Sequence, residues 1–217
     1  MKVQVGILAV LWFAVSQVLA QVQQLHVGCA LSSQARYLLQ VVNAAPAGPL
    51  AVTTTSSCQW EVNFALVIDR ADLELIGFRF RLKHATSKPP SVIVNASNVK
   101  FTEHVYVSDL PNTELAHSVP VIVVLKPRFS ASVSIVNSSS DGIVLYPGAT
   151  DFDVRCACSD FGTADINSQC VYVNGASHGS IDARAQNTET LGLSGRAVLL
   201  FSGAHHVKVK AMGINLA

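Results

Sequence analysis

The feature that most constrains this chain of 217 residues is a repeated pattern of two short apolar strands joined by a turn. Segments 143–154 and 198–209 both place alternating apolar residues on either side of a six-residue turn. The two turns also agree in sequence, with Pro-Gly-Ala in the first and Ser-Gly-Ala in the second. Alternation with a period of two is typical of β-strands that bury one face. The pattern therefore predicts a repeated unit of two strands.

Further copies of the unit occur along the chain. The first strands carry Phe64 and Leu66, Val92 and Val94, Val123 and Leu125, Ile143 and Leu145, Val171 and Val173, and Val198 and Leu200. The second strands begin at Leu73, Val99, Val133, Phe152, Ile181 and Val207, in steps of 26, 34, 19, 29 and 26 residues. Periods of about 20–50 residues indicate a solenoid. Because such a unit cannot bury its own apolar face, neighbouring units must stack.

One segment, 32–42, has the pattern of a helix. Ala35, Leu38, Leu39 and Val42 share one face at helical spacing. The segment Asn43–Gly48, which contains a proline, ends the helix. We expect the helix to cover the first open end of the solenoid, because uncovered strand edges pair with other chains.

The helix is followed by segments 48–52 (GPLAV), 64–68 (FALVI) and 71–78 (ADLELIGF). In this order the segments resemble the start of a right-handed parallel β-helix of the pectin-lyase-like superfamily, and the later repeats resemble its turns. The resemblance implies an all-β fold of three parallel sheets with a short N-terminal capping helix. The alternative is an antiparallel β-sandwich, which also contains many short strands. The in-register repeat of strands and turn favours the β-helix.

Residues 1–20 have the composition of a secretory signal peptide. Lys2 precedes an almost unbroken apolar run, and Val18-Leu19-Ala20 offers a cleavage site with small residues. The alternative is an uncleaved membrane anchor, but the run is short for a span of about 20 residues. We expect a secreted, extracellular protein without a transmembrane anchor. Residues 21–217 are expected to form one β-helix domain, shortened at its C-terminus because no capping element follows Val209.

The composition excludes two classes of protein. Half of the chain is apolar and only 13% is charged, which excludes intrinsic disorder. The net charge is +1 and no basic patch is present, so nucleic acid is not expected as a partner. Aromatic residues make up 7% of the chain, so no platform for stacking sugars is evident.

The five cysteines predict disulfides, because export places them in an oxidising compartment. Cys29 and Cys58 bracket the helix, and a bridge between them would attach it to the first turn. Cys170 pairs with Cys158 or with Cys156, of which we name Cys158, and one thiol is left over.

The alternative use of the cysteines is a metal site. Cys156 and Cys158 would supply two ligands and the adjacent His205 and His206 two more. A Cys-x-Cys pair alone is not a recognisable zinc spacing. We therefore expect no metal and no cofactor.

Two glycosylation sequons are present, at Asn95 and Asn137. Asn95 falls in a tight turn and Asn137 in a serine-rich loop, so both are expected to be exposed. The alternative for Asn95 is a turn residue that tolerates left-handed geometry.

Charged residues follow the outward positions of the last three second strands. These residues are Asp153, Arg155, Asp182, Arg184, Lys208 and Lys210. Carboxylates beside arginine and lysine suit an acidic sugar, which arginine binds in a bidentate manner. The bland alternative is charge pairing that keeps a sheet surface soluble. We expect a surface or wall-associated protein that binds glycans or has a structural role, with a polysaccharide or cell-surface glycan as partner.

The alternative function is a polysaccharide lyase or hydrolase acting on acidic glycans. Hydrolases of the superfamily that the chain resembles would show paired aspartates and a Gly-His-Gly segment, whereas here His178-Gly179-Ser180 lacks the first glycine. Lyases would show a cluster of aspartates for Ca²⁺, and no compact cluster is visible. No convincing pair of carboxylates for glycosidase chemistry can be identified either, so the sequence assigns no catalytic residue.

Overall fold

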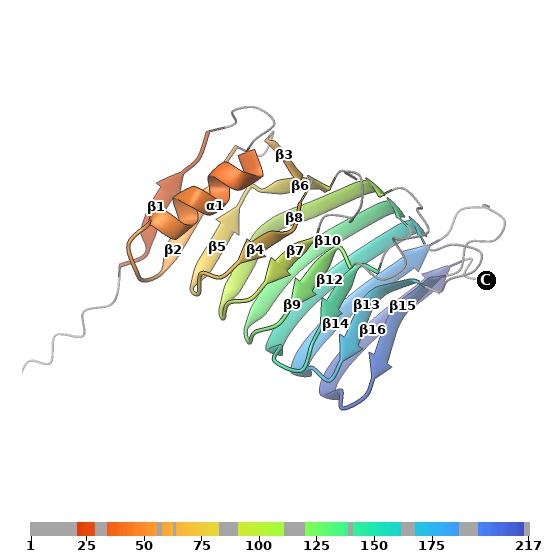
Figure 1. The fold of residues 1–217 in the computed structure, drawn as a ribbon. Helices are drawn as coiled ribbons and strands as arrows, with labels where there is room; N and C mark the ends of the chain where they lie inside the picture. Colours follow the sequence, from red (N-terminus) through yellow and green to blue (C-terminus); the bar gives the residue numbers. More distant parts are fainter. Residues whose placement is uncertain are drawn as a thin grey trace, which may run out of the picture.

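The chain folds into a right-handed parallel β-helix of about five turns (Figure 1). The computed structural model describes residues 21–28, 34–55, 58–62, 64–82, 91–110, 120–138, 141–161, 168–186 and 195–214. Every strand pair among these residues is parallel. The predicted β-helix is thus confirmed, and the antiparallel sandwich is excluded.

Two sheets run along the helix. The larger contains, in spatial order, β1 (Gln23–His26), β2 (Leu50–Thr53), β5 (Leu73–Ile76), β8 (Val99–Leu110), β10 (Phe129–Ser138), β12 (Thr150–Phe161), β14 (Ser177–Gln186) and β16 (His205–Ile214). The smaller contains β15 (Gly195–Phe201), β13 (Ser168–Asn174), β11 (Ile143–Leu145), β9 (Ile122–Val124), β7 (Val92–Val94) and β4 (Leu66–Ile68). A third ladder joins β3 (Gln59–Val62) and β6 (Arg79–Leu82).

The core consists of rows of apolar residues that repeat from turn to turn. One row of the smaller sheet contains Leu66, Val92, Ile122, Ile143, Val171 and Val198. The first five of these are completely buried. Burying one such side chain contributes about 1.5–3 kcal/mol, so the stacking of turns supplies the stability that a single turn lacks.

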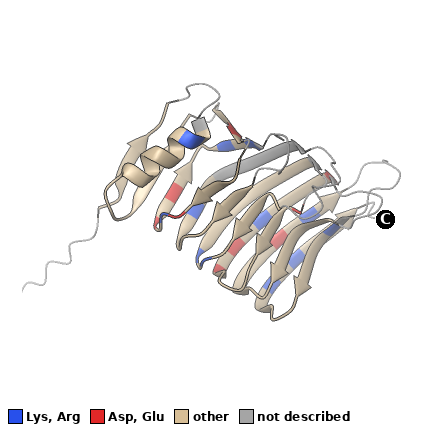
Figure 2. Ribbon diagram, in the orientation of Figure 1, with Lys and Arg blue, Asp and Glu red and all other residues tan. Residues whose placement is uncertain are grey.

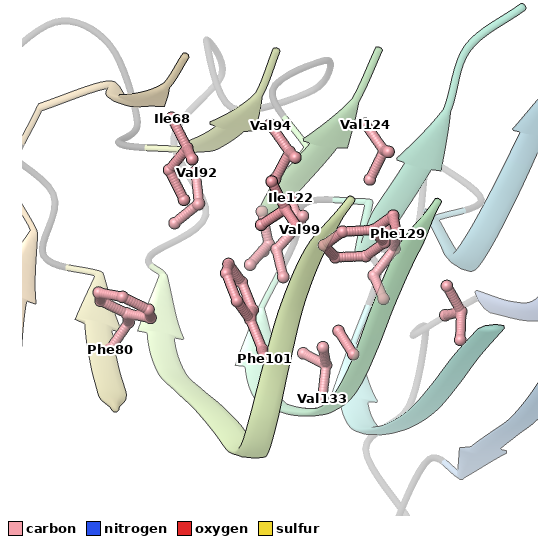
Figure 3. Packing of buried hydrophobic residues seen from close by; sticks show 14 of the residues in the cluster. Ile68, Phe80, Val92, Val94, Val99, Phe101, Ile122, Val124, Phe129 and Val133 are labelled. Atoms are coloured by element: carbon pink, nitrogen blue, oxygen red, sulfur yellow. The ribbon is translucent and has the colours of Figure 1, made fainter. Parts of the chain in front are cut away.

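A file of aromatic rings fills the core of the earlier turns. Trp60, Phe78, Phe80, Phe101 and Phe129 follow one another with ring centroids 5.2, 6.0, 6.1 and 5.7 Å apart. Figure 3 shows Phe80, Phe101 and Phe129 directed into the interior, below the aliphatic side chains of the facing sheet. Such pairs contribute about 0.5–1.5 kcal/mol beyond the burial of their area.

One corner of the helix is formed by a column of residues in the left-handed backbone conformation. The column contains Asp72, Asn98, Arg128, Asp151, His178 and His206, with φ between 54° and 59°. Asn, Asp and His are the non-glycine residues most enriched in this conformation. Within the column the amide of Asn98 donates to Asp72 Oδ1 at 2.7 Å. The backbone therefore bends in the same way at this corner in each successive turn of the β-helix.

The helix α1 (Gln34–Ala44) covers the N-terminal end of the core, as predicted (Figure 1). Of its predicted apolar face, Ala35, Leu38 and Val42 are buried and Leu39 is partly buried. The guanidinium of Arg70 donates to the carbonyl oxygens of Val42 at 3.2 Å and Ala45 at 2.9 Å, which satisfies acceptors at the end of the helix. No helix within the described ranges is both long and apolar enough to cross a membrane.

The register of the larger sheet differs from the sequence prediction at two turns. Phe129, rather than Val133, is in register with Val99 and Phe152. In the next turn Gly179, rather than Ile181, is opposite Phe152. Both predictions were wrong by an even number of residues. Because side chains alternate between faces with a period of two, the predicted inward and outward faces survive the error.

The smaller sheet corrects two further predictions. Ile122 and Val124, rather than Val123 and Leu125, form the buried row, so this prediction was wrong by one residue and inverted the faces. In the first copy Leu66 and Ile68 form the row, and Phe64 is partly buried beside the guanidinium of Arg36, whose Cζ lies 4.9 Å from the ring centroid.

The last described turn is more open than predicted. Val209 is in register with the buried Ile181, yet it is 41% exposed, and Leu200 is 49% exposed. Val207 is only partly buried. An inward residue of a solenoid is covered by the turns on both sides, and within the described residues no turn covers β15 and β16. Val207 lies in the row of Phe152 and Gly179, as predicted for Phe152, but the predicted alignment of Val207 with Ile181 was wrong. The predicted burial of this turn was wrong as well.

Candidate functional site

The six charged residues predicted as a ligand site share the outward face of the larger sheet. They lie pairwise on three adjacent strands, with Asp153 and Arg155 on β12, Asp182 and Arg184 on β14, and Lys208 and Lys210 on β16. Asp182 is half-buried and the other five are exposed. Figure 2 shows acidic and basic residues interspersed over these strands.

The observed register places opposite charges side by side. Arg155, Asp182 and Lys210 form one row across the three strands. The sequence alignment had instead placed Asp182 in a row with Asp153 and Lys208. In the structure Ser180 occupies that position. Asp182 therefore lies between two cations.

Both carboxylates of the face have partners. Lys210 Nζ lies 3.2 Å from Asp182 Oδ2, and the hydroxyl of Ser180 donates to Asp153 Oδ1. In contrast, the guanidinium groups of Arg155 and Arg184 have no hydrogen bond or ion pair within the described part of the chain. The face thus presents two arginines whose donors are available to a ligand.

The two arginines line a shallow groove of about 190 Å³. The groove is lined by Ser132, Val133, Arg155, Cys156, Ala157, Asp182 and Arg184. Ala157 is opposite Arg184 in the register, and its short side chain leaves room beside the guanidinium. A guanidinium binds carboxylate, sulfate or phosphate oxygens through two parallel hydrogen bonds. We call this site the arginine groove.

A second groove, of about 230 Å³, lies near the N-terminal end of the larger sheet. Its charged groups are satisfied internally, since Lys100 Nζ lies 3.0 Å from Glu74 Oε1 and Asn98 donates to Asp72. This pairing also covers part of the Glu74 side chain, which is half-buried. Because the charged groups of the second groove already have partners, the arginine groove is the better candidate for a ligand site.

Among the described residues that line the arginine groove, Asp182 supplies the one carboxylate. Hydrolysis of a glycosidic bond usually requires two carboxyl groups on either side of it. The residues lining this groove therefore match ion recognition better than acid–base catalysis.

The predicted pairing of Cys158 with Cys170 is observed, with an Sγ–Sγ distance of 2.16 Å. Cys156 is free and buried, and its Sγ lies 3.1 Å from that of Cys170. Burial raises the pKa of the Cys156 thiol, which disfavours the reactive thiolate. Cys58 is buried, whereas Cys29 lies outside the described residues, so the predicted bridge between them stays a prediction.

The histidines proposed as partners of these cysteines in a metal site lie elsewhere. Cys156, Cys158 and Cys170 form one buried cluster, whereas His205 and His206 belong to a separate exposed cluster with His178. The sequence showed the adjacent pair of histidines but not the third, because its position depends on the register of two turns.

The sequon residues have different settings. Asn95 is exposed in the turn after β7, and its amide donates to Asp69 Oδ1 at 2.8 Å. The left-handed residue of this turn is Asn98 rather than Asn95. Asn137 belongs to β10 instead of a loop, and its side chain is outside the described ones. Residues 1–20 are also outside the described ranges.

One titrating residue was missed by the sequence analysis. Burial raises the pKa of Asp141, although the backbone N–H of Gln169, which donates to Asp141 Oδ1 at 2.8 Å, opposes the shift. The neighbouring Gly142 indicates a turn, but nothing in the sequence indicates that the carboxyl group is buried there.

The chain was also compared with known proteins. No protein-family model matches it, and no curated protein or solved structure does so either. The parallel β-helix and the arginine groove therefore rest on the strand pairing and the side-chain geometry of this chain.

Proposed function

We propose that the protein is an exported β-helix of the pectin-lyase-like type that binds acidic glycans at a cell surface or wall through its arginine groove. The single observation that carries the proposal is the pair of guanidinium groups, Arg155 and Arg184, that line one groove without a carboxylate partner among the described residues.

The chemistry of the groove favours an acidic sugar over a neutral one. Neutral sugars are commonly held by stacking on aromatic rings, and none of the described residues that line the groove is aromatic. A uronate carboxylate or a sulfate group offers two neighbouring oxygens that can accept two parallel hydrogen bonds from one guanidinium. Asp182, already paired with Lys210, can accept a hydrogen bond from a sugar hydroxyl beside them.

Long-range attraction plays a small part in this proposal. The six residues of the face carry four positive and two negative charges, and the whole chain has a net charge of +1. Recognition would therefore depend on close, charge-assisted hydrogen bonds rather than on steering by a strong field.

The alternative is a lyase or hydrolase acting on the same class of polymer. It has weaker support, because Asp182 is the only carboxylate among the described residues that line the groove. Incubating the protein with uronate polymers, with and without Ca²⁺, and measuring new reducing ends or unsaturated products would separate binding from cleavage.

The test of binding is a glycan array that contains uronate and sulfated polymers, followed by titration of the best ligand. The double variant R155A/R184A should lose about 10- to 100-fold in affinity per arginine, as expected for hydrogen bonds to charged groups. The matched control is K100A, which removes an exposed cation of the same sheet that is paired with Glu74. Circular dichroism should show that both variants keep the fold.

Two outcomes would overturn the proposal. The first is an array on which the wild-type protein binds no acidic polymer. The second is a double variant that binds as tightly as K100A. Export is tested separately, by determining whether the N-terminus of the protein in the culture medium lies near Gln21.

A further inference from the structure

Three histidines of two successive turns meet on the surface. One ring nitrogen from each of His178, His205 and His206 lies within 4.8 Å of the others, and all three side chains are exposed. His178 and His206 stack almost in parallel, with ring centroids 4.8 Å apart and an interplanar angle of 12°. His205 meets the other two rings edge-on, at 5.5 and 5.2 Å.

The fold explains two of the three positions. His178 and His206 are consecutive members of the left-handed corner column, so the register stacks them directly. His205 is not a member of that column. It follows the tight turn at Gly203, and its backbone is in register with Ser177. The column therefore accounts for a pair of stacked rings, but not for the third imidazole beside them.

Hydrogen bonds orient two of the rings. The Nδ1 of His205 donates to the carbonyl oxygen of Gly203 at 2.7 Å, which requires the tautomer with the proton on Nδ1. The Nδ1 of His178 lies 3.1 Å from the hydroxyl of Ser177. Because the proton of His205 is on Nδ1, the lone pair of its Nε2 is free to bind a ligand. Histidines that bind metals usually donate their other ring N–H to a carbonyl or a similar acceptor.

We propose that His178, His205 and His206 bind a divalent transition-metal ion, Zn²⁺ or Cu²⁺. Imidazole nitrogen suits both ions. A tetrahedral ion with metal–nitrogen bonds of 2.0–2.1 Å requires nitrogens about 3.4 Å apart, so the rings must approach one another by a small amount. Because all three are exposed, side-chain rotation achieves this without repacking the core.

The site would have an open coordination position. Three protein ligands leave a fourth position for water or for a donor atom of another molecule. Of the charged residues nearby, Asp151 precedes His178 in the corner column, and Lys208 lies two residues after His206 on the same strand. The carboxylate of Asp151 favours a bound cation and the ammonium of Lys208 opposes it. Because these two charges offset each other, the affinity for the ion depends mainly on the three imidazoles.

The experiment uses the full protein purified without a polyhistidine tag. Zn²⁺ affinity is measured by competition with a chromophoric chelator, and Cu²⁺ is used as a spectroscopic probe whose electron paramagnetic resonance spectrum reports bound nitrogens. We expect one ion per chain and nitrogen hyperfine structure from imidazole ligands. Zn²⁺ should also raise the melting temperature, because an ion that binds the folded state stabilises it.

The variants are chosen to preserve the corner. Asparagine tolerates left-handed geometry and already occupies the column at Asn98, so the substitutions are H178N, H206N and H205A. All proteins are produced in a bacterial host, because H178N creates the sequon Asn-Gly-Ser. Each is expected to weaken Zn²⁺ binding by about 100-fold or more, since losing even an outer partner of a ligand costs roughly 10–100-fold. The control is H26A, which removes an exposed histidine on β1 at the other end of the larger sheet.

The outcomes are distinct. Zn²⁺ affinity that is unchanged in the triple variant H178N/H205A/H206N, or equally reduced in H26A, would overturn the proposal. So would a wild-type protein that binds neither ion at millimolar concentration, which would leave the rings as a packing arrangement of the corner. The variant R155A/R184A should bind Zn²⁺ normally, so this test does not depend on the glycan proposal.

Discussion

The ring of Phe152 occupies the space in which Gly179, its register partner in the next turn, would carry a side chain. A Cβ atom built on Gly179 would lie 2.4 Å from Cδ2 and from Cε2 of Phe152. Phe152 is 3% exposed and lies in the inward row of the larger sheet. The large residue of one turn therefore requires the absence of a side chain in the next.

This relationship predicts a coupled pair of substitutions. G179A should destabilise the protein by about 1–3 kcal/mol, as overpacking of a core does. In the background F152L the same substitution should cost less, because the smaller side chain leaves room for the Cβ atom. Denaturant unfolding of the four proteins in the double-mutant cycle measures the coupling. Equal costs of G179A in the two backgrounds would contradict the proposed contact.

Phe152 itself is predicted to be a major part of the core. F152A should lower the free energy of unfolding by about 3–5 kcal/mol, through lost burial and the cavity left behind. The same denaturant experiment provides the value. A loss below about 1 kcal/mol would show that neighbouring turns close around the site.

Asp141 is predicted to make stability depend on pH. Because burial raises the pKa of this carboxyl group, the folded state keeps the proton to a higher pH than the unfolded state. Between the ordinary pKa of 3.8 and the raised value the folded state binds more protons, so the contribution of Asp141 to stability falls as pH rises through this window.

The variant D141N tests this sign. Asparagine keeps an oxygen that can accept the N–H of Gln169 but carries no charge, so D141N should be more stable than wild type at pH 7 and similar to it below pH 3.8. The control D141A removes the oxygen that accepts the N–H of Gln169, so its free energy of unfolding should be about 1–3 kcal/mol lower than that of D141N. Thermal unfolding as a function of pH distinguishes these outcomes, and a D141N curve parallel to wild type would refute the assignment.

The disulfide and the free thiol give a further prediction. The bridge between Cys158 and Cys170 closes a loop with a sequence separation of 12, which is worth about 3 kcal/mol in the chain-entropy model. C158A/C170A, made in the background C156A, should lose about this amount relative to C156A alone. In the wild-type protein, iodoacetamide should modify Cys156 only after unfolding, because the thiol is buried. Rapid modification under native conditions would contradict this.

The repeat was visible in the sequence because its alternation of apolar residues has a period of two. Gly179 concealed the true register of its turn, since the inward position there carries no side chain and Ile181 offered a better apolar match. In contrast, the run from Val121 to Leu125 is apolar throughout, so it contains no alternation that could distinguish the inward face. The faces were inverted only in this run.

The charged face was predictable for the same reason, and its contacts were not. Alternation placed Arg155 and Arg184 outward whatever the register. The pairing of Asp182 with Lys210, which leaves the two arginines available, depends on which residues of neighbouring turns are opposite each other. The histidine cluster likewise requires His178 and His206 to be in register, although they are 28 positions apart.

The parallel stacking places the outward side chains at regular intervals along the axis of the β-helix. Neighbouring strands of a sheet are about 4.8 Å apart, so side chains in one row mark equal steps along the axis. A linear polymer lying along this axis meets one side chain at each step, and its repeat must be commensurate with the spacing to satisfy several rows together. The row of cations can be extended by design. An arginine introduced by A157R would lie one strand away from Arg184 in the same row and would add one cation at the same spacing.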